Sequence, residues 1–504
     1  MDFLVLAPPV CTPAEPPSGA FLLAAGLAGH GYETGLLDLS LEFFHRVLND
    51  SKIPGPSPVQ SMRYLLDTRE GYEPLRHRSA TGVLHKKLNG FAKRFPGWKL
   101  TLMDISHPNR VHDPVAISSQ MTQESPFTDL WEEVLNPVLV RLKPRKVLVS
   151  LAYLSQLAAA IDLVRFLEKR GVSAVVGGSL PTSLASTGHG IEILGRVFKC
   201  IETGDGMSLI AKATEAHMLD RLGWPAIISK KPYLSARPIV PLTLSTGCFW
   251  SRCLFCPDRC LDFVSVPERA IERFFSKMPE EISTRRPIIH LLDSAIPPGQ
   301  LRRFLPLAKE NDVGFYGFAR PTTGLLEQGL LEQAAASGLL MLQLGVESGS
   351  AGLLERFHKG FAPSEAEKVM RRAADLGVRN YLYLLFGLPG ESDSDRCATL
   401  DFVSKNADSV DFLNLSLFNL PRYCELTERA GEFGVEIGDF PDDGSIRLYW
   451  PFTCNGESPR DEARRFLSES FNTEPRIREA LLRTPRWFRA AHLALMKLDE
   501  RKGP

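Results

Sequence analysis

Strand-like and helix-like segments alternate regularly between residues 241 and 418. Short apolar runs, which predict strands, lie at 241–247, 288–293, 314–319, 339–346, 380–386 and 412–418. Stretches with helical spacing of apolar residues separate them, at 267–282, 299–311, 325–337, 363–376 and 393–405. Strands that alternate with helices of this length pair in parallel, so the pattern predicts a partial (βα)6 barrel of the TIM type. In such barrels the functional groups lie at the carboxyl ends of the strands.

A less regular alternation occupies the first 225 residues. Strands are expected at 3–7, 34–39, 146–152 and 173–176, and helices at 21–30 and 156–169. This pattern is typical of a doubly wound, Rossmann-like α/β domain, which binds ligands at the carboxyl ends of its strands. Small or polar residues stand at several of these ends, where small residues let a ligand approach the backbone. They are Ser150, Gly177, Gly178, Ser179, Gly204 and Asp205.

Three segments interrupt or follow these alternations. Residues 50–140 form an insertion rich in Pro, Arg and His, and its length predicts structure of its own. Residues 226–240 are interpreted as a linker, and 421–504 as a C-terminal extension. We therefore expect an N-terminal domain at 1–225, the linker, a barrel at 241–420 and the extension.

Charge and hydropathy exclude some classes of function. The chain has 504 residues, with 59 Lys and Arg against 59 Asp and Glu, so the formal net charge is zero. No basic excess favours nucleic acid as a partner, and the basic stretch at 85–99 is interpreted as a solvated helix face. No apolar run is long enough to predict a transmembrane helix, and the N-terminus lacks the pattern of a signal peptide. A cytoplasmic protein is expected.

Three of the nine cysteines lie within nine residues, directly after the first strand of the predicted barrel. The segment reads Thr246-Gly247-Cys248-Phe249-Trp250-Ser251-Arg252-Cys253-Leu254-Phe255-Cys256-Pro257. Thiolates are soft ligands that suit an iron–sulfur cluster or zinc, and three of them leave one iron of a 4Fe–4S cluster without a protein ligand. The alternative is a structural zinc site with Cys260 as the fourth ligand, because structural zinc takes four.

This loop resembles the cluster loop of radical S-adenosylmethionine (SAM) enzymes, including the aromatic Phe255 before the third cysteine. The commonest spacing in that family has three residues between the first two cysteines. Here there are four, which is similar to a variant found in members with a cobalamin domain. Segments 288–294, 315–320, 342–350 and 381–391 also resemble the family's later strands, in order.

The resemblance implies that Cys248, Cys253 and Cys256 hold a 4Fe–4S cluster whose open iron chelates SAM. Reductive cleavage of SAM would give a 5′-deoxyadenosyl radical that abstracts hydrogen from the substrate. The resemblance gives as SAM-binding residues Glu347, Ser348, Arg320, Asp293, Gly387 and Pro389. It identifies no further catalytic residue.

The first domain resembles a cobalamin-binding domain, and its strand-end residues from Ser150 to Asp205 would then contact cobalamin. The cobalt-ligating histidine of the Asp-x-His-x-x-Gly signature is absent, since the chain reads Asp38-Leu39-Ser40. The implied reaction is methyl transfer to carbon. The alternatives are another radical transformation beside a vestigial cobalamin domain, or a non-catalytic metal or cobalamin protein. Expected partners are a small-molecule or peptide substrate and a reductant such as flavodoxin or ferredoxin.

Overall fold

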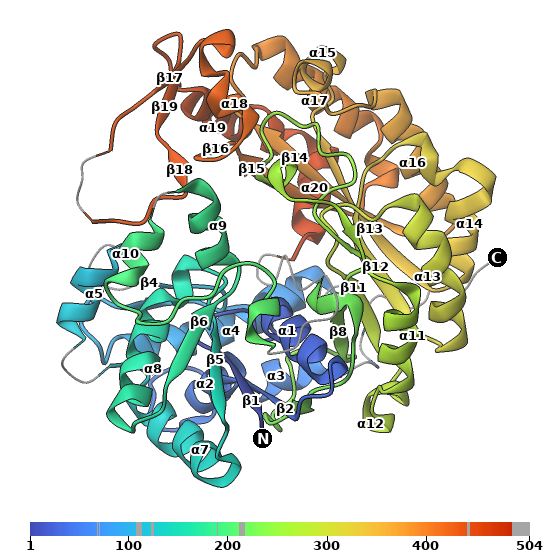
Figure 1. The fold of residues 1–504 in the computed structure, drawn as a ribbon. Coiled ribbons are helices and arrows are strands. Elements are labelled where there is room, and N and C mark those ends of the chain that lie inside the picture. Colours follow the sequence, from blue (N-terminus) through green and yellow to red (C-terminus); the bar gives the residue numbers. More distant parts are fainter. Residues whose placement is uncertain are drawn as a thin grey trace.

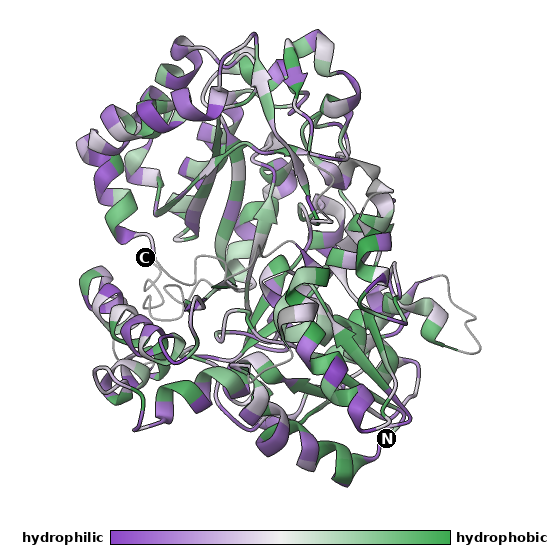
Figure 2. Ribbon diagram, turned by 90° about the vertical axis from the view of Figure 1, so that its left-hand side faces the viewer, coloured by the Kyte–Doolittle hydropathy of each residue, from purple (hydrophilic) through white to green (hydrophobic). Residues whose placement is uncertain are grey.

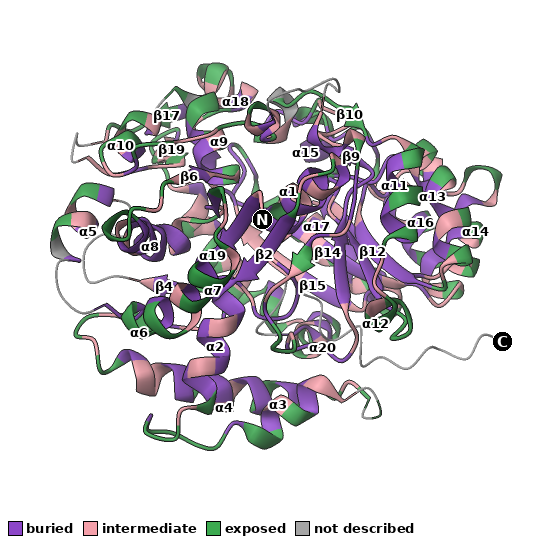
Figure 3. Cartoon of the chain, turned by 60° about the horizontal axis from the view of Figure 1, so that its bottom comes forward, coloured by how far each residue is buried: buried purple, intermediate pink, exposed green. Residues whose placement is uncertain are grey.

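Two parallel β-sheets, each flanked by helices, form the body of the protein (Figure 1). The structure is a computed structural model that describes residues 1–485, except Thr68, Glu70, 107–112, 122–124, His189, 211–216 and 441–443. The strands of both sheets are mostly hydrophobic in Figure 2 and buried in Figure 3, whereas the outer helices carry mixed residues. This distribution is typical of parallel sheets that other elements cover.

The first sheet has the order β6-β5-β1-β2-β7, with all strands parallel. Its strands are β1 (Phe3–Ala7), β2 (Thr34–Asp38), β5 (Lys146–Ser150), β6 (Ala174–Gly177) and β7 (Ala226–Ile227). The helices between them include α1 (Ser18–Gly29), α8 (Leu157–Lys169) and α9 (Ser179–Thr187). After β2 the chain crosses to β5 on the other side of β1. The carboxyl ends of β1 and β5 therefore flank the switch point at which doubly wound sheets bind ligands.

This sheet extends into the segment predicted to be a linker. Strand β7 pairs with β2 through Gly35 with Ala226 and Leu36 with Ile227. A strand of two residues carries no periodic signal in the sequence, because its existence depends on the neighbouring strand edge that it completes.

The described part of the insertion at 50–140 is mainly helical. It contains α3 (Val59–Leu66), α4 (Pro74–Ala92), α5 (Pro114–Gln120), α6 (Thr128–Leu130), α7 (Asn136–Leu142) and the short strands β3 (Lys99–Leu100) and β4 (Ile105–Ser106). Helix α4 packs on α2 (Leu39–Asn49) with Leu84 and Leu88 fully buried. Between α3 and α4, the Tyr72 hydroxyl donates to the Arg483 carbonyl at 2.6 Å, and its ring centroid lies 6.5 Å from that of Phe412. The insertion thus reaches the second sheet.

The second sheet has the order β15-β14-β13-β12-β11-β8, also all parallel. Its strands are β8 (Ile239–Leu242), β11 (Ile288–Leu291), β12 (Gly314–Ala319), β13 (Leu339–Glu347), β14 (Arg379–Phe386) and β15 (Phe412–Leu417). The helices on its outer side are α11 (Glu268–Ser276), α13 (Pro298–Glu310), α14 (Leu330–Ala336), α16 (Pro363–Asp375) and α17 (Asp393–Lys405). Chain order and spatial order agree, as in a partial barrel. The predicted fold class, a doubly wound domain followed by a partial TIM-type barrel, is confirmed.

The C-terminal extension returns to the barrel. It comprises β16 (Leu420–Pro421), α18 (Glu425–Glu428), β17 (Val435–Ile437), β18 (Tyr449–Trp450), β19 (Phe452–Cys454), α19 (Pro459–Glu469) and α20 (Pro475–Arg483). Leu426 and Val435 belong to one apolar cluster with Leu254 of the cysteine loop and with Phe357. The extension therefore covers the loop. Across the residues that the structure describes, no helix has the length and apolar character to span a membrane.

Helix α1 joins the two sheets into one apolar core. Its sequence, Ser-Gly-Ala-Phe-Leu-Leu-Ala-Ala-Gly-Leu-Ala-Gly, has no polar face, which is typical of a helix buried on all sides. The ring centroid of Phe21 lies 5.6 Å from that of Trp224 and 6.2 Å from that of Phe274 in α11. One continuous cluster contains Val5 of the first sheet, Phe21 and Ile289 of the second.

We expect Phe21→Ala to lower the free energy of unfolding by about 3–5 kcal/mol, because it removes a large side chain that is 1% exposed. Since the core is shared, both sheets should unfold in one transition in urea, followed by circular dichroism and tryptophan fluorescence. The control is Leu75→Ala, at a side chain that is 67% exposed, with a change within about 0.5 kcal/mol. Two separate transitions in the wild type would contradict the shared core.

Candidate active site

The cysteine loop begins where the chain leaves β8, and Asp293 fixes that point. Asp293, which follows β11, is 1% exposed and accepts hydrogen bonds from the Leu244 amide at 3.0 Å and the Ser245 hydroxyl at 2.5 Å. Burial raises the pKa of Asp293, which these two donors oppose. The strand predicted at 241–247 ends at Leu242 in β8, and the Leu244 amide bonds to a side chain rather than to a neighbouring strand.

Gly247 then turns the chain into the loop. Its φ is +70°, and a Cβ at this position would collide with the Asp262 carbonyl, so the turn requires glycine. Behind it, β9 (Ser245–Thr246) pairs antiparallel with β10 (Val264–Ser265) and closes the base of the loop.

The three thiols of the loop lie close enough to influence one another. Cys253 is buried, and Cys248 and Cys256 are partly exposed. Burial raises the pKa of Cys256 to about 12 and also that of Cys253, where Lys359 and Arg320 act in the opposite direction. Thiols in such surroundings keep their protons until a metal replaces them.

These thiols do not converge on one point. No three His, Cys, Asp or Glu side chains in the described ranges lie close enough together to hold a single metal ion. In a 4Fe–4S cluster each thiolate binds a different iron, so its ligands need not converge. The side chain of Cys260, the fourth ligand of the zinc alternative, lies outside what the structure describes.

Arg320 joins the loop to the end of β12. Its Nη1 lies 4.0 Å from Cys253 Sγ, and its guanidinium carbon lies 4.2 Å from the ring centroid of Trp250. Its Nη2 donates to the carbonyl oxygen of Lys359. Burial lowers the pKa of Arg320, which the neighbouring thiols oppose. The side chain is therefore a buried cation that faces the sulfur atoms.

Glu347 ends β13 beside the same group. Its Oε1 accepts a hydrogen bond from Lys359 Nζ at 2.8 Å, and both side chains are mostly buried. The φ of Glu347 is +66°, a costly conformation for a residue with a side chain, which occurs where the strand pairing shifts register. The strained backbone presents the carboxylate to the lysine.

The indole ring of Trp250 packs directly against Gly360. Its Nε1 donates to the His358 carbonyl at 2.9 Å, and a Cβ at Gly360 would overlap the indole ring. The segment 358–360 therefore contacts the cysteine loop through Trp250.

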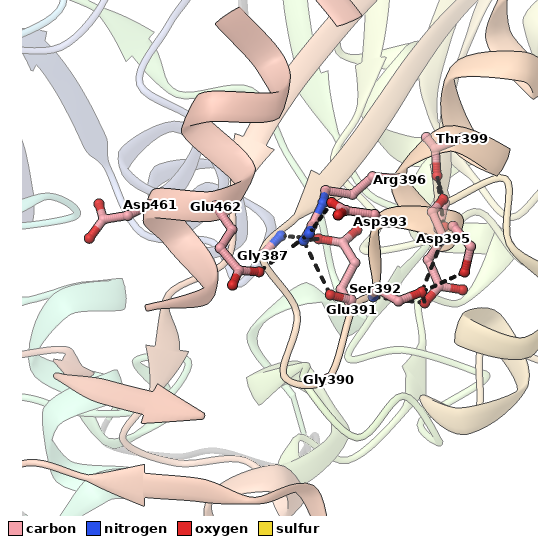
Figure 4. A network of polar contacts seen from close by, with 12 residues as sticks. Gly387, Gly390, Glu391, Ser392, Asp393, Asp395, Arg396, Thr399, Asp461 and Glu462 are labelled. Atoms are coloured by element: carbon pink, nitrogen blue, oxygen red, sulfur yellow. Dashed lines mark hydrogen bonds and ion pairs between the residues drawn. The ribbon is translucent and has the colours of Figure 1, made fainter. Parts of the chain in front are cut away.

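Ser348 is turned into the protein rather than toward the loop (Figure 4 shows its partner Thr399). Its hydroxyl lies 2.9 Å from that of Thr399 and accepts a hydrogen bond from the Ser350 amide at 3.1 Å. The Ser350 hydroxyl in turn donates to Asp395 at 2.5 Å. This arrangement ties the turn after β13 to α17.

Gly387 and Pro389 form the next turn, after β14. The Gly387 amide donates to Glu391 Oε2 at 2.6 Å, and Arg396 Nη1 lies 3.8 Å from the same oxygen (Figure 4). The φ of Gly387 is +79°, and its Cα faces the Pro459 carbonyl of α19. The buried carboxyl of Glu391 thus shapes the turn.

The structure brings some predicted residues together and separates others. Arg320 and Glu347 lie with the cysteines, Gly387 and Pro389 lie on a neighbouring turn, and Asp293 and Ser348 bond to backbone and hydroxyl groups. Sequence reasoning missed as site residues Lys359, Trp250, Glu391 and Thr399. The Lys359-Gly360 pair and the Trp250 position were signals that could have indicated the first two.

At the first sheet, most of the predicted residues share one edge. Ser150 pairs with Gly177, and the Ser179 hydroxyl donates to the Ala152 carbonyl at 3.1 Å. Gly178 has a φ of +118°, and a Cβ there would lie 2.7 Å from the Leu151 carbonyl oxygen. At the carboxyl ends of β5 and β6, backbone atoms and small side chains therefore make up most of the surface.

Gly204 and Asp205 differ from each other in what they contact at this edge. The Gly204 amide donates to the Thr182 hydroxyl of α9 at 3.0 Å, and a Cβ at Gly204 would have no neighbour within 4 Å. The Asp205 carboxylate instead accepts from the Met207 amide at 3.0 Å and the Met218 amide at 2.8 Å. Asp205 therefore stabilises its own loop.

The titration of Glu391 gives a testable consequence. Burial raises its pKa from the ordinary 4.5 to about 7, so the folded protein keeps a proton that the unfolded chain releases. The free energy of unfolding should therefore fall as the pH rises from about 4.5 to 7, by on the order of 3 kcal/mol. Glu391→Gln should flatten this dependence in urea unfolding between about pH 5 and pH 8. Glu281→Gln, at an exposed residue, should keep it; an unchanged slope in Glu391→Gln would refute the assignment.

Known proteins resemble this chain in part of its sequence and in its fold. Residues 242–403 match the Radical SAM superfamily. The solved structure of the radical SAM methyltransferase TsrM from Kitasatospora setae, with cobalamin and a 4Fe–4S cluster bound, is 14% identical. It has a TM-score of 0.50, with 92% of this chain and 85% of that chain covered.

The cobalamin-dependent SAM radical enzyme OxsB, solved with aqua-cobalamin and SAM, is 13% identical, with a TM-score of 0.55 and 94% and 67% coverage. At such identities these similarities show a shared fold. No curated protein sequence matches the chain. The cysteine loop after β8 and strands β11 to β14 lie within residues 242–403, the part of the chain that matches the Radical SAM superfamily.

Proposed function

We propose that this protein is a cobalamin-dependent radical SAM enzyme that activates a substrate C–H bond for methyl transfer to carbon. The observation that carries the proposal is the joining of three features at the mouth of the barrel. These are the thiols of the cysteine loop, the Arg320 guanidinium 4.0 Å from Cys253 Sγ, and the Glu347–Lys359 ion pair.

The residues fit a cluster. Cys248, Cys253 and Cys256 are free cysteines on one loop, and Arg320 supplies positive charge that offsets the negative charge of thiolate ligands. The Phe255 and Phe357 rings, 6.1 Å apart, cover the loop on its apolar side and limit the access of water. When bound, a 4Fe–4S cluster supplies the electron that splits a carbon–sulfur bond of SAM into a 5′-deoxyadenosyl radical and methionine.

The surrounding residues fit a SAM zwitterion. Arg320 is the candidate partner of its carboxylate, and Glu347 of its amino or ribose groups, because these are charged side chains at the strand ends beside the cysteines. Lys359 orients Glu347 through their hydrogen bond. Gly387 and Pro389 would lie along the adenine. For Ser348 and Asp293 we propose a positioning role, since their polar atoms already have partners within the protein.

The edge of the first sheet fits a large flat ligand. Ser150, Gly177, Gly178, Ser179 and Gly204 present backbone and small side chains at the carboxyl ends of the strands, beside the switch point. When bound there, cobalamin supplies a carrier for the methyl group. The sharing of fold with TsrM and OxsB supports this assignment. A reducing protein of the flavodoxin or ferredoxin type would deliver the electrons.

Metal content is the first test. We expect about four irons and about one cobalt per chain in protein purified anaerobically from cells supplied with cobalamin. Iron without cobalt would leave a radical SAM enzyme and refute the role of cobalamin. One zinc and no iron after reconstitution would contradict the cluster assignment.

Cys253→Ala should abolish both cluster formation, read from the visible absorption band, and cleavage of SAM to 5′-deoxyadenosine. The loss follows because each of the three thiolates binds its own iron. The matched control is Cys397→Ala, at an exposed cysteine of α17, which should keep both. A Cys253→Ala protein that still cleaves SAM would overturn the proposal.

A further inference from the structure

The inner face of the barrel carries a defined set of side chains. Successive residues of a strand point to opposite faces. Ile289, Phe315, Leu342 and Leu382 pack in the core formed with the outer helices. The alternate positions therefore face inward, and they group in a separate cluster of Ile239, Ile288, Tyr316, Met341, Tyr381 and Phe412.

This cluster closes the amino-terminal end of the inner face. Tyr316 and Met341 are fully buried, and Tyr381 is 1% exposed. Tyr72 from the insertion packs against the same cluster. These residues close the amino-terminal end of the inner face, and Tyr72 of the insertion covers them from solvent. We call them the floor.

The next inward positions toward the cysteine loop are partly exposed. They are Phe318, Gly345, Tyr383, Leu385, Asn414 and Ser416, and we call them the upper layer. Tyr383 is opposite Asn414 in the pairing of β14 with β15, and Leu385 is opposite Ser416. A Cβ at Gly345 would lie 2.9 Å from Glu347 Oε1, so the upper layer directly adjoins the proposed SAM site.

Aromatic rings dominate one side of the upper layer. The ring centroids of Phe318 and Tyr383 are 4.8 Å apart at an interplanar angle of 62°. Gln343 Nε2 donates to the Tyr383 hydroxyl at 2.9 Å and fixes the orientation of that ring. Walls of this kind accept a planar ring through stacked or edge contacts.

None of the six residues of the upper layer carries a formal charge. On the inner face of the six described strands, no Asp, Glu, Lys or Arg lies between the floor and the strand-end residues Arg320 and Glu347. On β11, the Nδ1 of His290 lies 3.0 Å from Glu15 Oε2 of the first domain, and the His290 ring stacks on Tyr316. Because an unpaired charge costs several kcal/mol to bury, this layer disfavours a charged guest.

We propose that the substrate enters the upper layer with an uncharged aromatic ring that carries an amide-like hydrogen-bonding edge. Phe318 and Tyr383 contact the ring, and the Asn414 amide and Ser416 hydroxyl contact its polar edge. The inference deepens the proposed function, since it names the class of substrate beside the proposed SAM site, and as a substrate assignment it rests on that function.

Three small probes test it without a loaded cofactor. Benzamide is neutral and aromatic, benzoate is its charged analogue, and cyclohexanecarboxamide keeps the amide without the ring. Saturation-transfer NMR on the full chain should show benzamide binding at least about tenfold more tightly than either of the others, a preference worth about 1.4 kcal/mol. Equal binding of benzoate or cyclohexanecarboxamide, or no binding of any probe, would overturn the inference.

Variants locate the binding. Phe318→Leu keeps an apolar side chain and removes the ring, and Asn414→Asp keeps the shape and adds a charge. Each should weaken benzamide binding about tenfold, whereas Phe263→Ala, at a side chain that is 41% exposed, should not. Unchanged binding in both variants would overturn the inference, and thermal melts confirm that they fold. The probe preference needs neither iron nor SAM. A failure of the metal test therefore leaves it standing, and its own failure leaves the metal test untouched.

Discussion

The two hydrogen bonds that Asp293 accepts determine where the cysteine loop can lie. The buried carboxylate of Asp293 accepts hydrogen bonds from the Leu244 amide and the Ser245 hydroxyl, directly after the point where the chain leaves the sheet. Three contacts of the loop come after this point in the chain. Gly247 makes the turn, Trp250 packs against Gly360, and Cys253 lies beside Arg320.

The shared core gives the two sheets a fixed relation. Helix α1 begins at the carboxyl end of β1, near Ser150, and its rings pack on α11 of the barrel. The Glu15–His290 pair crosses the same boundary in a buried setting. A reaction that uses groups from both sheets needs their edges held together, and this architecture supplies it through packing rather than through a hinge.

The sequence predicted the strands of both sheets well, because apolar runs buried on both faces give a strong local signal. The prediction failed where a contact with a residue distant in the sequence sets the end of a strand or the orientation of a side chain. Strand β8 ends before its apolar run does, since Asp293 accepts a hydrogen bond from the Leu244 amide, 49 residues earlier in the chain. Ser348 has the right position for a ligand, yet Thr399 turns it inward. Lys359 follows the end of β13 by 12 residues, and the turn of the chain after α15 (Ala351–Arg356) brings it back to Glu347. The proposed cluster ligands were easier to predict, because the spacing of Cys248, Cys253 and Cys256 is local.

The C-terminal extension packs over the cysteine loop but is synthesised after it. The Leu426 amide donates to the Leu254 carbonyl at 2.9 Å, and Val435 packs in the same cluster. These residues leave the ribosome roughly ten to thirty seconds after the loop, at translation rates of about 5–20 residues per second. During that interval the loop is uncovered on the nascent chain. Metal delivery thus has a window before the last segment arrives, and a stalled or truncated chain would leave the thiols open to oxidation.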